Sequence, residues 1–329
     1  MRNEKQTIGA VLGMVTGDCV GGPYVFMKSA QLFDMSRQIS WQVHPMGVNS
    51  QLMMAGMQAI YRHGFVPDAL VRHYYQRLNQ TMVEPDMVSS RFFAQTRKSA
   101  AHLYVMAIAS DHGALCSGQL LIRQLPVILS GMGLSAEIVS SRIATEARLT
   151  HTDPDCIEYA QMYGLCMRGI LLGHGRSEIW DQLFATVQSP AVYRTLLSSY
   201  YEKPVCDAST YSHAGITLQL ALYHYWHDTP FVSAIRSAAL SGGATDVNCA
   251  AVGGLLGASQ GIETIPSAWR EILLNDTSNK RALRRTIRYA AAMPQYIRTP
   301  PKIQPMRTMR MDHTPSSHIH SREIRSAAC

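Results

Sequence analysis

Two segments of the sequence gather small and polar residues of the kind that hold anions or metal ions. The later one, SGGATDVNCAAVGGLLG (241–257), begins with loop-forming residues and continues into a helix rich in glycine and alanine. Thr245, Asp246 and Asn248 cluster where this helix begins. Their oxygens can cap the helix by accepting its unpaired N–H groups, or they can contribute to a metal or anion site at the helix N-terminus. The sequence leaves both interpretations open.

The earlier segment is GAVLGMVTGDCVGGP (9–23), and its glycines also allow a close approach of the backbone. We expect a helix up to about Gly17 that then breaks into a loop. Glycine permits a ligand or a neighbouring helix to lie against the main chain. The segment is not a phosphate-binding P-loop, because no Gly-Lys-Ser/Thr follows. Close helix packing followed by a turn is the default interpretation.

Other reactive residue types give weaker signals. The seven cysteines form no CxxC pair, and an odd number scattered over a long chain predicts reduced thiols in the cytoplasm rather than a disulfide framework. Cys19 and Cys249 fall in the two segments above, but the sequence pairs neither with a base. His224 and His227 share a helix face without a third ligand, so a buried pair is expected in preference to a zinc site.

Helices must position these residues, because apolar residues recur at helical spacing and strand-like alternation is nearly absent. The segment 216–226 is apolar on almost every face, which predicts a buried helix. Asp153-Pro154, Pro190 and Pro266-Ser267 mark boundaries between periodic segments. The sequence therefore predicts an all-α fold.

Composition and charge limit the organisation of the chain. Of the 329 residues, 47% are hydrophobic and 16% charged, which predicts a globular protein. The net charge of +7 arises at the C-terminus, since residues 280–329 hold 11 Lys and Arg against 2 Asp and Glu. We expect one helical domain over 1–279, then a basic helix and a disordered tail over 280–329. Nucleic-acid binding is not expected except through the tail, and neither a membrane span nor a secretion signal is expected.

The two small-residue segments together resemble the ADP-ribosylglycohydrolase family, which includes the dinitrogenase-reductase activating enzymes. Residues 9–26 resemble its opening GAxxGxxxGDxxGxPxEF, and residues 241–269 resemble GGDTDTxAAxxGxxxGAxxGxxxIPxxW. Between them, 122–126 resembles MRxxP and 150–154 resembles TH-x-x-P. The resemblance implies a single large orthogonal helical bundle with a central cleft. It also implies a pair of magnesium or manganese ions and hydrolysis of the bond that joins ADP-ribose to a side chain.

The family motifs that supply metal ligands are largely missing from this sequence. The early Thr/Ser-Asp-Asp-Thr motif and the late Asp-x-Asp-Thr motif fall on Gly47, Val48, Asn49, Ser50, Ala244, Asp246 and Val247. Only Asp246 keeps a carboxylate, and hard divalent ions prefer several charged oxygen ligands. The resemblance thus implies a degenerate metal site in which Asp246 is a weak candidate ligand. Asp18, Asp153 and Asp155 are the carboxylates that remain as substitutes.

A sugar-diphosphate site can survive these losses, because backbone N–H groups need no particular side chain. The family's GNG segment falls on residues 117–119, and its glutamate of GxPxE falls on Val25. The expected ligand cleft is formed by Asp18, Val25, Ser117, Gly118, Gln119, His151, Gly242, Gly243, Thr245 and Asn248.

We therefore expect a catalytically inactive pseudoenzyme without a cofactor that binds ADP-ribose, an ADP-ribosylated protein or another protein partner. One alternative is an active hydrolase of ADP-ribosylated arginine or serine that uses magnesium or manganese at Asp246 with help from Asn49. Another is a structural protein, since jellyfish lens crystallins are similar to this family. A third is an immunity or antagonist protein that binds an ADP-ribosylating toxin or its target.

Overall fold

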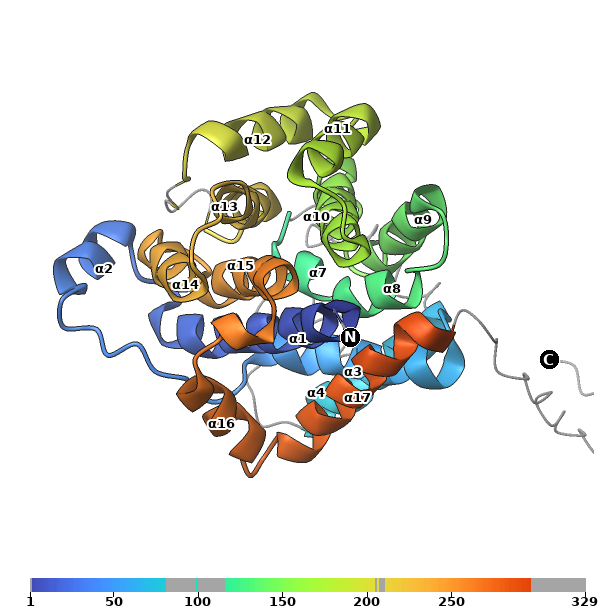
Figure 1. Cartoon of the computed structure of the whole chain (residues 1–329), viewed down its shortest axis with the longest axis horizontal. Coiled ribbons are helices and arrows are strands. Elements are labelled where there is room, and N and C mark those ends of the chain that lie inside the picture. The colour runs from blue at the N-terminus through green and yellow to red at the C-terminus, as the bar shows by residue number, and fades with distance from the viewer. Residues whose placement is uncertain (1, 81–98, 100–115, 205, 207–210, 297–329) are drawn as a thin grey trace, which may run out of the picture. The chain divides into compact units, whose positions relative to one another are not determined.

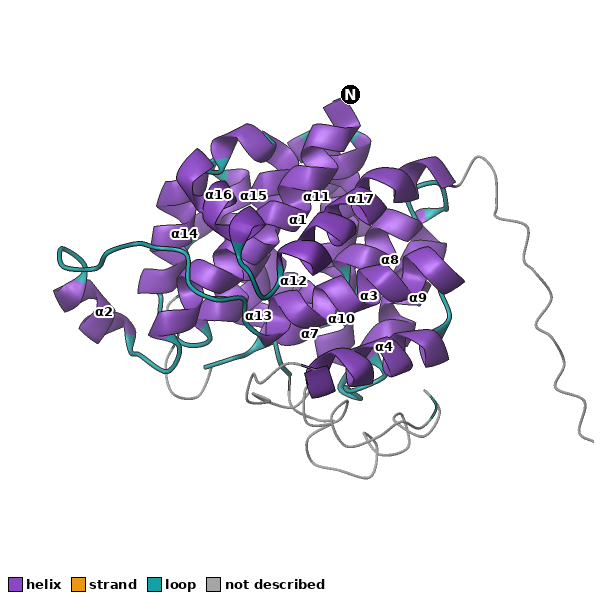
Figure 2. Ribbon diagram, turned by 90° about the horizontal axis from the view of Figure 1, so that it is seen from below, coloured by secondary structure: helices purple, strands orange, loops and turns teal. Residues whose placement is uncertain are grey.

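The computed structural model describes residues 2–80, 99, 116–204, 206 and 211–296. Within these ranges the secondary structure is helical, and β-type pairing is limited to an isolated antiparallel bridge between Ser117 and His213 (Figure 2). The predicted all-α fold is confirmed. The tail that was predicted to be disordered, 299–329, lies outside the described residues.

Figure 1 shows how the helices follow one another. They are α1 (Arg2–Gly21), α2 (Ser29–Met35), α3 (Val48–His63), α4 (Pro67–Gln80), α7 (Gln119–Ile122), α8 (Leu125–Ser130), α9 (Ala136–Ala147), α10 (Pro154–Leu172), α11 (Arg176–Thr186), α12 (Pro190–Tyr201), α13 (Ala214–Trp226), α14 (Phe231–Leu240), α15 (Thr245–Gln260), α16 (Ser267–Asn275) and α17 (Lys280–Tyr296). Short 3-10 helices occupy Gly22–Tyr24 and Ile262–Thr264.

Proline and a short polar side chain begin several of these helices, as the sequence predicts. The Asp153 carboxylate accepts the N–H of Cys156 at the start of α10, and the Ser189 hydroxyl accepts two N–H groups at the start of α12. Proline follows each cap directly, at a position where its missing N–H leaves no hydrogen bond unmade. The boundaries at Asp153-Pro154, Pro190 and Pro266-Ser267 are confirmed.

Helices α1 and α15 pack backbone against backbone. Glycines recur every fourth residue along one face of α1, and a Cβ atom added at any of them would overlap a carbonyl group of α15. The facing pairs are Gly9–Gly257, Gly13–Gly253, Gly17–Cys249 and Gly21–Thr245. The expectation that α1 ends near Gly17 is wrong. The helix continues to Gly21 because its last turn packs on the first turn of α15.

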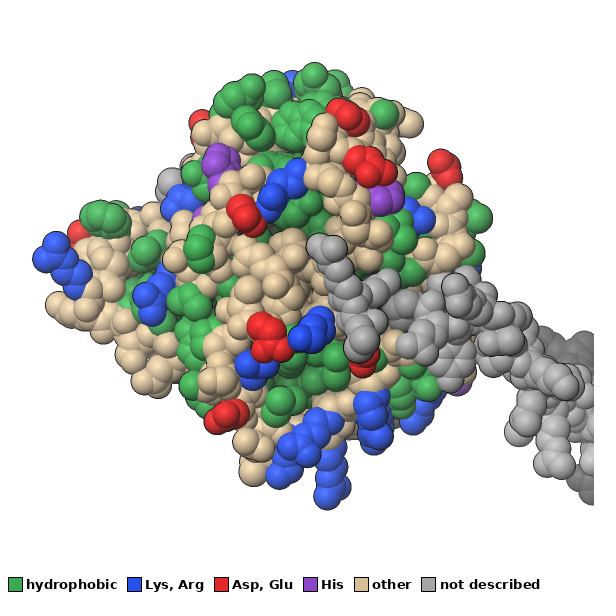
Figure 3. Space-filling view, in the orientation of Figure 1, with side chains coloured by type: hydrophobic (Ala, Val, Ile, Leu, Met, Phe, Trp, Pro, Cys, Tyr) green, Lys and Arg blue, Asp and Glu red, His purple; other side chains and the backbone are tan. Residues whose placement is uncertain are grey.

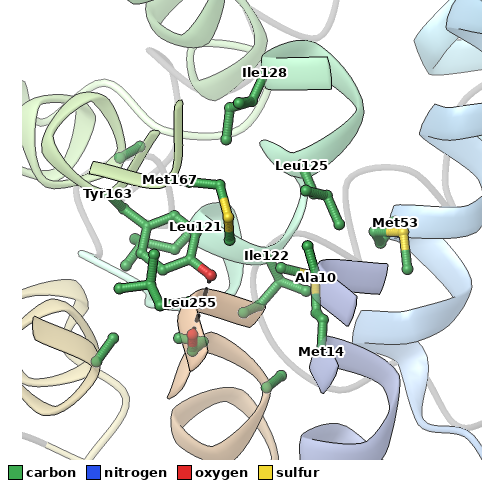
Figure 4. Close-up of a cluster of buried hydrophobic side chains, with 14 of the residues drawn as sticks. Ala10, Met14, Met53, Leu121, Ile122, Leu125, Ile128, Tyr163, Met167 and Leu255 are labelled. Carbon is green, nitrogen blue, oxygen red and sulfur yellow. Dashed lines mark hydrogen bonds between the residues drawn. The ribbon is translucent and has the colours of Figure 1, made fainter. Parts of the chain in front are cut away.

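The hydrophobic core surrounds this helix pair (Figure 4). Met14 of α1 and Leu255 of α15 lie among side chains from α3, α7, α8 and α10, all buried. The Tyr163 hydroxyl of α10 donates a hydrogen bond of 3.1 Å to the Ala251 carbonyl of α15, which satisfies the one polar group that this ring brings into the core. Helix α13 also packs on α15, and its predicted burial is confirmed.

The basic helix α17 belongs to the same compact unit as the helices before it. Leu283, Ala290 and Met293 are buried where α17 contacts α1, α3, α8 and α16. The predicted division of the chain after residue 279 stays a prediction, and the described residues of α17 pack on the helices before it. The outer face of α17 carries the exposed residues Arg281, Arg284, Arg285 and Arg288, and Figure 3 shows Lys and Arg side chains gathered there.

Among the described residues, no single helix has the length and apolar composition to cross a membrane, although the bent pair Glu4–Tyr24 and Ser29–Met35 meets those two criteria together.

Candidate functional site

One side-chain amide joins the two carboxylates of the candidate site. Asn49 Nδ2 donates to Asp18 Oδ1 at 3.0 Å and to Asp246 Oδ2 at 2.8 Å. Asn49 Oδ1 accepts a hydrogen bond of 3.0 Å from Gln119 Nε2. A carboxylate only accepts hydrogen bonds here, so the amide nitrogen must face the carboxylates and the amide oxygen must face Gln119.

Four helices bring these side chains together. Asp18 lies in the last turn of α1, Asn49 and Asp246 lie in the first turns of α3 and α15, and Gln119 begins α7. The N-cap of α3 is Gly47, where an added Cβ would lie 2.8 Å from Asp18 Oδ1. The absence of a side chain at position 47 therefore lets α3 begin directly against the Asp18 carboxylate.

The site is largely closed to solvent. Asp18, Asn49 and Gln119 are buried, and Asp246 is partly exposed. Burial raises the pKa of the Asp18 carboxyl, an effect that hydrogen bonds from Ser50 and Asn49 oppose. The Ser50 N–H donates to Asp18 Oδ2 at 3.0 Å. Asp18 is thus held by neutral donors, which partly offset the cost of removing a carboxylate from water.

The expected phosphate-binding segment 117–119 lies beside α13 and α15. The Gly118 N–H donates to the Ser212 carbonyl at 2.8 Å, and the Gln119 N–H donates to the Ser117 hydroxyl at 3.3 Å. The N–H groups of Gly118 and Gln119 are therefore engaged inside the protein, and phosphate binding by them requires the segment to rearrange.

Polar contacts continue from this segment to the start of α15. Thr217, against which Gly118 packs, donates to Asn248 Oδ1 at 2.8 Å. Asn248 Nδ2 in turn lies 3.3 Å from the Gly242 carbonyl. The Thr245 hydroxyl donates to the Gly21 carbonyl at 2.7 Å, which ties α15 to the end of α1. The structure thus brings Gly118, Gly242 and Asn248 into one polar network.

Gly242 and Gly243 form the turn that leads into α15. Their φ angles are +80° and +74°, in the left-handed region that favours glycine. An added Cβ at Gly243 would lie 2.7 Å from Cys206 Cβ. The two glycines therefore meet both a conformational and a steric requirement.

Comparison with known proteins assigns the family. The model of the ADP-ribosylglycohydrolase family matches residues 2–298. The chain belongs to the ADP-ribosylglycohydrolase family. A protein of Acanthamoeba polyphaga mimivirus that is named as a candidate ADP-ribosyl glycohydrolase (L543) is 22% identical over 311 residues, covering 84% of this chain and 93% of that protein.

Two further proteins extend the comparison. The ADP-ribosyl-[dinitrogen reductase] glycohydrolase of Rhodospirillum rubrum is 25% identical over 166 residues, which are 50% of this chain and 53% of that enzyme. A solved structure titled as an ADP-ribosylglycohydrolase-related protein complex superposes with a TM-score of 0.72 at 19% identity, covering 89% of this chain and 98% of the other. This likeness shows the ADP-ribosylglycohydrolase fold.

The cation pair of the ADP-ribosylglycohydrolase motifs does not fit the residues present here. Four of the motif positions carry no side-chain oxygen: Gly47, Val48, Ala244 and Val247. Across the described ranges, no three His, Cys, Asp or Glu side chains are grouped to hold a metal ion. Of the substitute carboxylates, Asp18 lies at the site and Asp153 caps α10 instead. Asp155 lies in the first turn of α10, near that cap.

His151 and Val25 are the two remaining residues of the expected cleft. His151 is buried beside Thr150, whose hydroxyl lies 2.8 Å from His151 Nδ1. Val25 lies in the connection after the first 3-10 helix. That connection reaches the start of α15, because the Gly243 N–H donates to the Met27 carbonyl at 3.4 Å.

A buried ion pair that sequence reasoning did not predict lies close to His151, because Arg123 also donates to the Thr150 hydroxyl at 2.9 Å. Arg123 Nε donates to Glu146 Oε1 at 2.8 Å, and both side chains are fully buried. Gln124 Nε2 and the Tyr74 hydroxyl also donate to Glu146, at 2.6 and 3.0 Å. The arginine of the MRxxP resemblance was visible in the sequence, but its partner lies 23 residues away and no spacing rule connects the two.

Proposed function

We propose that this protein is an inactive member of the ADP-ribosylglycohydrolase family, a pseudoenzyme that binds ADP-ribose or an ADP-ribosylated protein without hydrolysing it and without a metal ion. Three observations support the proposal: the donor set at the site, the charge balance there, and the polar network on which a ligand would rest.

The Asn49 amide carries this proposal. Hydrolysis in the manner that the family motifs imply needs a water activated by metal and carboxylates that stabilise positive charge on the sugar. Here the Asn49 Nδ2 atom contacts both Asp18 and Asp246, so a neutral N–H donor lies where the motif residues would bind a cation. Gln119 fixes the amide in this orientation. Binding a cation would require breaking this network.

The position of the backbone around the site supports the proposal that ADP-ribose binding is kept although hydrolysis is lost. Gly118, Gly242 and Gly243 lie in the segments where the family motifs bind substrate, and the network through Thr217 and Asn248 holds the two segments together. All three glycines are buried and their N–H groups donate to main-chain carbonyls, so ADP-ribose binding requires these segments to rearrange. A partly exposed Asp246 lies beside them. We infer that the site recognises the ribose and diphosphate of ADP-ribose through these segments.

An active hydrolase is the second candidate, favoured by the position of Asp18. The sequence analysis could name this carboxylate only as a possible substitute, and the structure puts it within hydrogen-bond distance of Asn49. If the Asn49 amide turned over, its oxygen and one oxygen each from Asp18 and Asp246 would converge on one point. Such a site would hold a single ion with three oxygen ligands.

Calorimetric titration separates the two candidates. The full chain is stripped of metal with EDTA and titrated with ADP-ribose, alone and with Mg²⁺ or Mn²⁺, with adenosine monophosphate as the ligand that lacks the second ribose. We expect ADP-ribose to bind equally well with and without either ion.

A second assay measures turnover. Release of ADP-ribose from an arginine- or serine-modified protein is followed over a range of Mn²⁺ concentrations, and we expect none. Release that depends on Mn²⁺ would establish the active hydrolase. Failure of ADP-ribose to bind under all these conditions would overturn the proposed binding function.

A further inference from the structure

A second cavity, apart from the candidate site, is formed by α3, α4 and α17. Helices α4 and α17 both pack on α3, and residues of all three helices line the cavity, which has a volume of about 120 Å³. On α3 the lining begins at Met54, more than one turn after Asn49. The cavity therefore shares no residue with the hydrogen-bonded group around Asn49.

The described residues that line this cavity include several cationic groups and no carboxylate. His73 and Arg77 come from α4, and Arg285 comes from α17. Guanidinium groups present N–H donors in a planar arrangement that matches the oxygen atoms of a phosphate group. Side-chain amides add further donors to the lining, from Gln58, Gln76 and Gln80.

The three helices around the cavity contain little negative charge. Helices α3 and α17 have no Asp or Glu, and α4 has only Asp68, in its first turn, whereas Arg77 lies in its last turn. In the part of the chain that the structure describes, no ion pair is formed by the arginines on the exposed face of α17 (Figure 3), Arg281, Arg284, Arg285 and Arg288. The positive charge on this face is therefore not neutralised by a neighbouring carboxylate.

The connection before α17 holds Arg77 at the cavity. Asn279 Nδ2 donates to Asp276 Oδ2 at 3.0 Å, which turns the Asn279 amide oxygen toward Arg77. Arg77 Nη2 donates to this oxygen at 2.7 Å. Burial lowers the pKa of the Arg77 guanidinium, because it disfavours the charged form. An anion bound beside Arg77 would offset this cost.

His73 also lies among like charges. Burial lowers the pKa of His73, and the charges of His63, Arg62 and Arg72 lower it further. The rings of His63 and His73 have their centroids 5.6 Å apart. An anion in the cavity would reverse this repulsion and favour the protonated imidazole.

An aromatic contact fixes α17 beside the cavity. Tyr289, which lines the cavity one turn after Arg285, stacks on Tyr61 of α3 with ring centroids 3.9 Å apart and 13° between the ring planes. The backbone that carries Arg285 is therefore held against α3, so the arginines of α4 and α17 are brought to one cavity by the fold.

We propose that this cavity binds one phosphate group, either inorganic phosphate or the phosphate of a small phosphomonoester. The volume of about 120 Å³ corresponds to roughly four water molecules, which suits one phosphorus with its four oxygens. Sites that enclose a drug-sized ligand have volumes of roughly 300–1,000 Å³, so the organic part of a phosphomonoester would lie outside the cavity. Phosphates in a nucleic-acid duplex are linked on both sides, and they fit an open basic surface better than a recess.

Calorimetric titration of the full chain with inorganic phosphate, in a phosphate-free buffer at constant ionic strength, tests the proposal. We expect saturable binding of one phosphate per chain. Glycerol 3-phosphate is the phosphomonoester, and we expect it to compete with phosphate for the same site. Phosphate binding without competition by glycerol 3-phosphate would restrict the ligand to the inorganic ion.

Two neighbouring exposed arginines of α17 provide a matched pair of variants. Arg285→Gln and Arg284→Gln remove the same charge, but Arg285 lines the cavity and Arg284 does not. We expect Arg285→Gln to weaken phosphate binding about tenfold or more, because it removes charge-assisted hydrogen bonds. Arg284→Gln should weaken it by about twofold or less, since salt screens a charge in solvent. Circular dichroism checks that both variants are folded.

Three results would overturn the proposal: no saturable phosphate binding by the wild type, equal weakening in the two variants, or displacement of phosphate by a DNA duplex. The titration is also repeated with saturating ADP-ribose, which should leave the phosphate affinity unchanged. Competition by ADP-ribose would place the phosphate at the candidate site instead. Failure of ADP-ribose to bind would leave the phosphate test intact, so the two proposals fail separately.

Discussion

Asn49 is the residue whose replacement should change the candidate site most, because both carboxylates accept hydrogen bonds from its one amide nitrogen. A neutral amide offsets the free-energy cost of burying the two carboxylates only through hydrogen bonds. A bound cation would offset this cost through its charge. Its concentration in solution can be varied, so its effect can be measured directly. Substitutions at position 49 therefore distinguish the two kinds of compensation.

Asn49→Asp should convert the site into one that responds to metal. The variant loses both donated hydrogen bonds and adds a third carboxylate, so in EDTA we expect the free energy of unfolding to fall by about 1–3 kcal/mol. Mn²⁺ should then raise the melting temperature, because the three carboxylates supply oxygen ligands and binding stabilises the folded state. Thermal unfolding with EDTA and with Mn²⁺ measures both effects. Asn49→Ala is the control: it should lose stability and show no response to Mn²⁺, and an equal response would contradict the interpretation.

His151 should make the protein sensitive to acid. Burial, with a contribution from Arg123, lowers the pKa of His151 from 6.5 to about 3. The unfolded chain therefore binds a proton at pH values where folded His151 does not. The free energy of unfolding should fall as the pH decreases from about 6.5 toward about 3, by at most about 1.4 kcal/mol per pH unit from this group.

His151→Asn should remove this contribution, since an asparagine amide can still hydrogen-bond to Thr150 but does not take up a proton. Urea unfolding at neutral pH and at pH values below 6.5 gives the slope for each protein. Substitution of the exposed His44 by Asn serves as the control. An unchanged slope in His151→Asn would show that other groups determine the acid sensitivity.

At the scale of helices, the glycine face of α1 determines how the site is assembled. The sequence identified these glycines, and close helix packing was the role predicted for them. The predicted end of the helix, near Gly17, is four residues too early. A glycine after position 17 predicts a loop when only local conformational preference is considered. The contact with α15, 224 residues further along the chain at Gly21 and Thr245, reverses that preference, and no local pattern contains this information.

Gly13→Ala should destabilise the protein although alanine favours helices. The substitution gains about 1 kcal/mol of helix propensity, but the new methyl group would overlap the Gly253 carbonyl, and backbone cannot turn aside as a side chain can. We expect a net loss of about 1–3 kcal/mol in the free energy of unfolding. Gly22→Ala is the matched control, because an added Cβ there meets nothing within 4 Å. Denaturant unfolding of both variants gives the comparison, and equal stabilities would refute the packing argument.

At the scale of the whole molecule, the fold was the most predictable property. Helical periodicity and proline-marked starts indicated the all-α architecture, and the glycine motifs indicated the family, because these signals are local or cover most of the chain. The Arg123–Glu146 pair was not predictable. It depends on residues from helices and connections that only the tertiary fold brings together.

The buried Arg123–Glu146 pair should contribute to the stability of the whole helical unit, because the residues that it joins lie on α4 and α9 and in the connection between α7 and α8. Arg123→Leu would leave Glu146 buried without a cation, and we expect a loss of about 3–5 kcal/mol in the free energy of unfolding. Glu146→Gln in the same background removes the uncompensated charge and should restore part of this loss. Urea unfolding of the single and double variants measures the recovery, and a double variant no more stable than Arg123→Leu would argue against a charge effect.

The backbone contact between α1 and α15 has a consequence for how this chain can change during evolution. Main-chain contacts at the glycines of α1 set the spacing between positions 18 and 246. In proteins that fold around a metal, loss of one ligand can unfold the chain. In this protein the side chains at the candidate site can be substituted during evolution, and its chemistry can change with them, while α1 and α15 keep their backbone contact. Selection on folding and selection on activity therefore act on different residues of this protein.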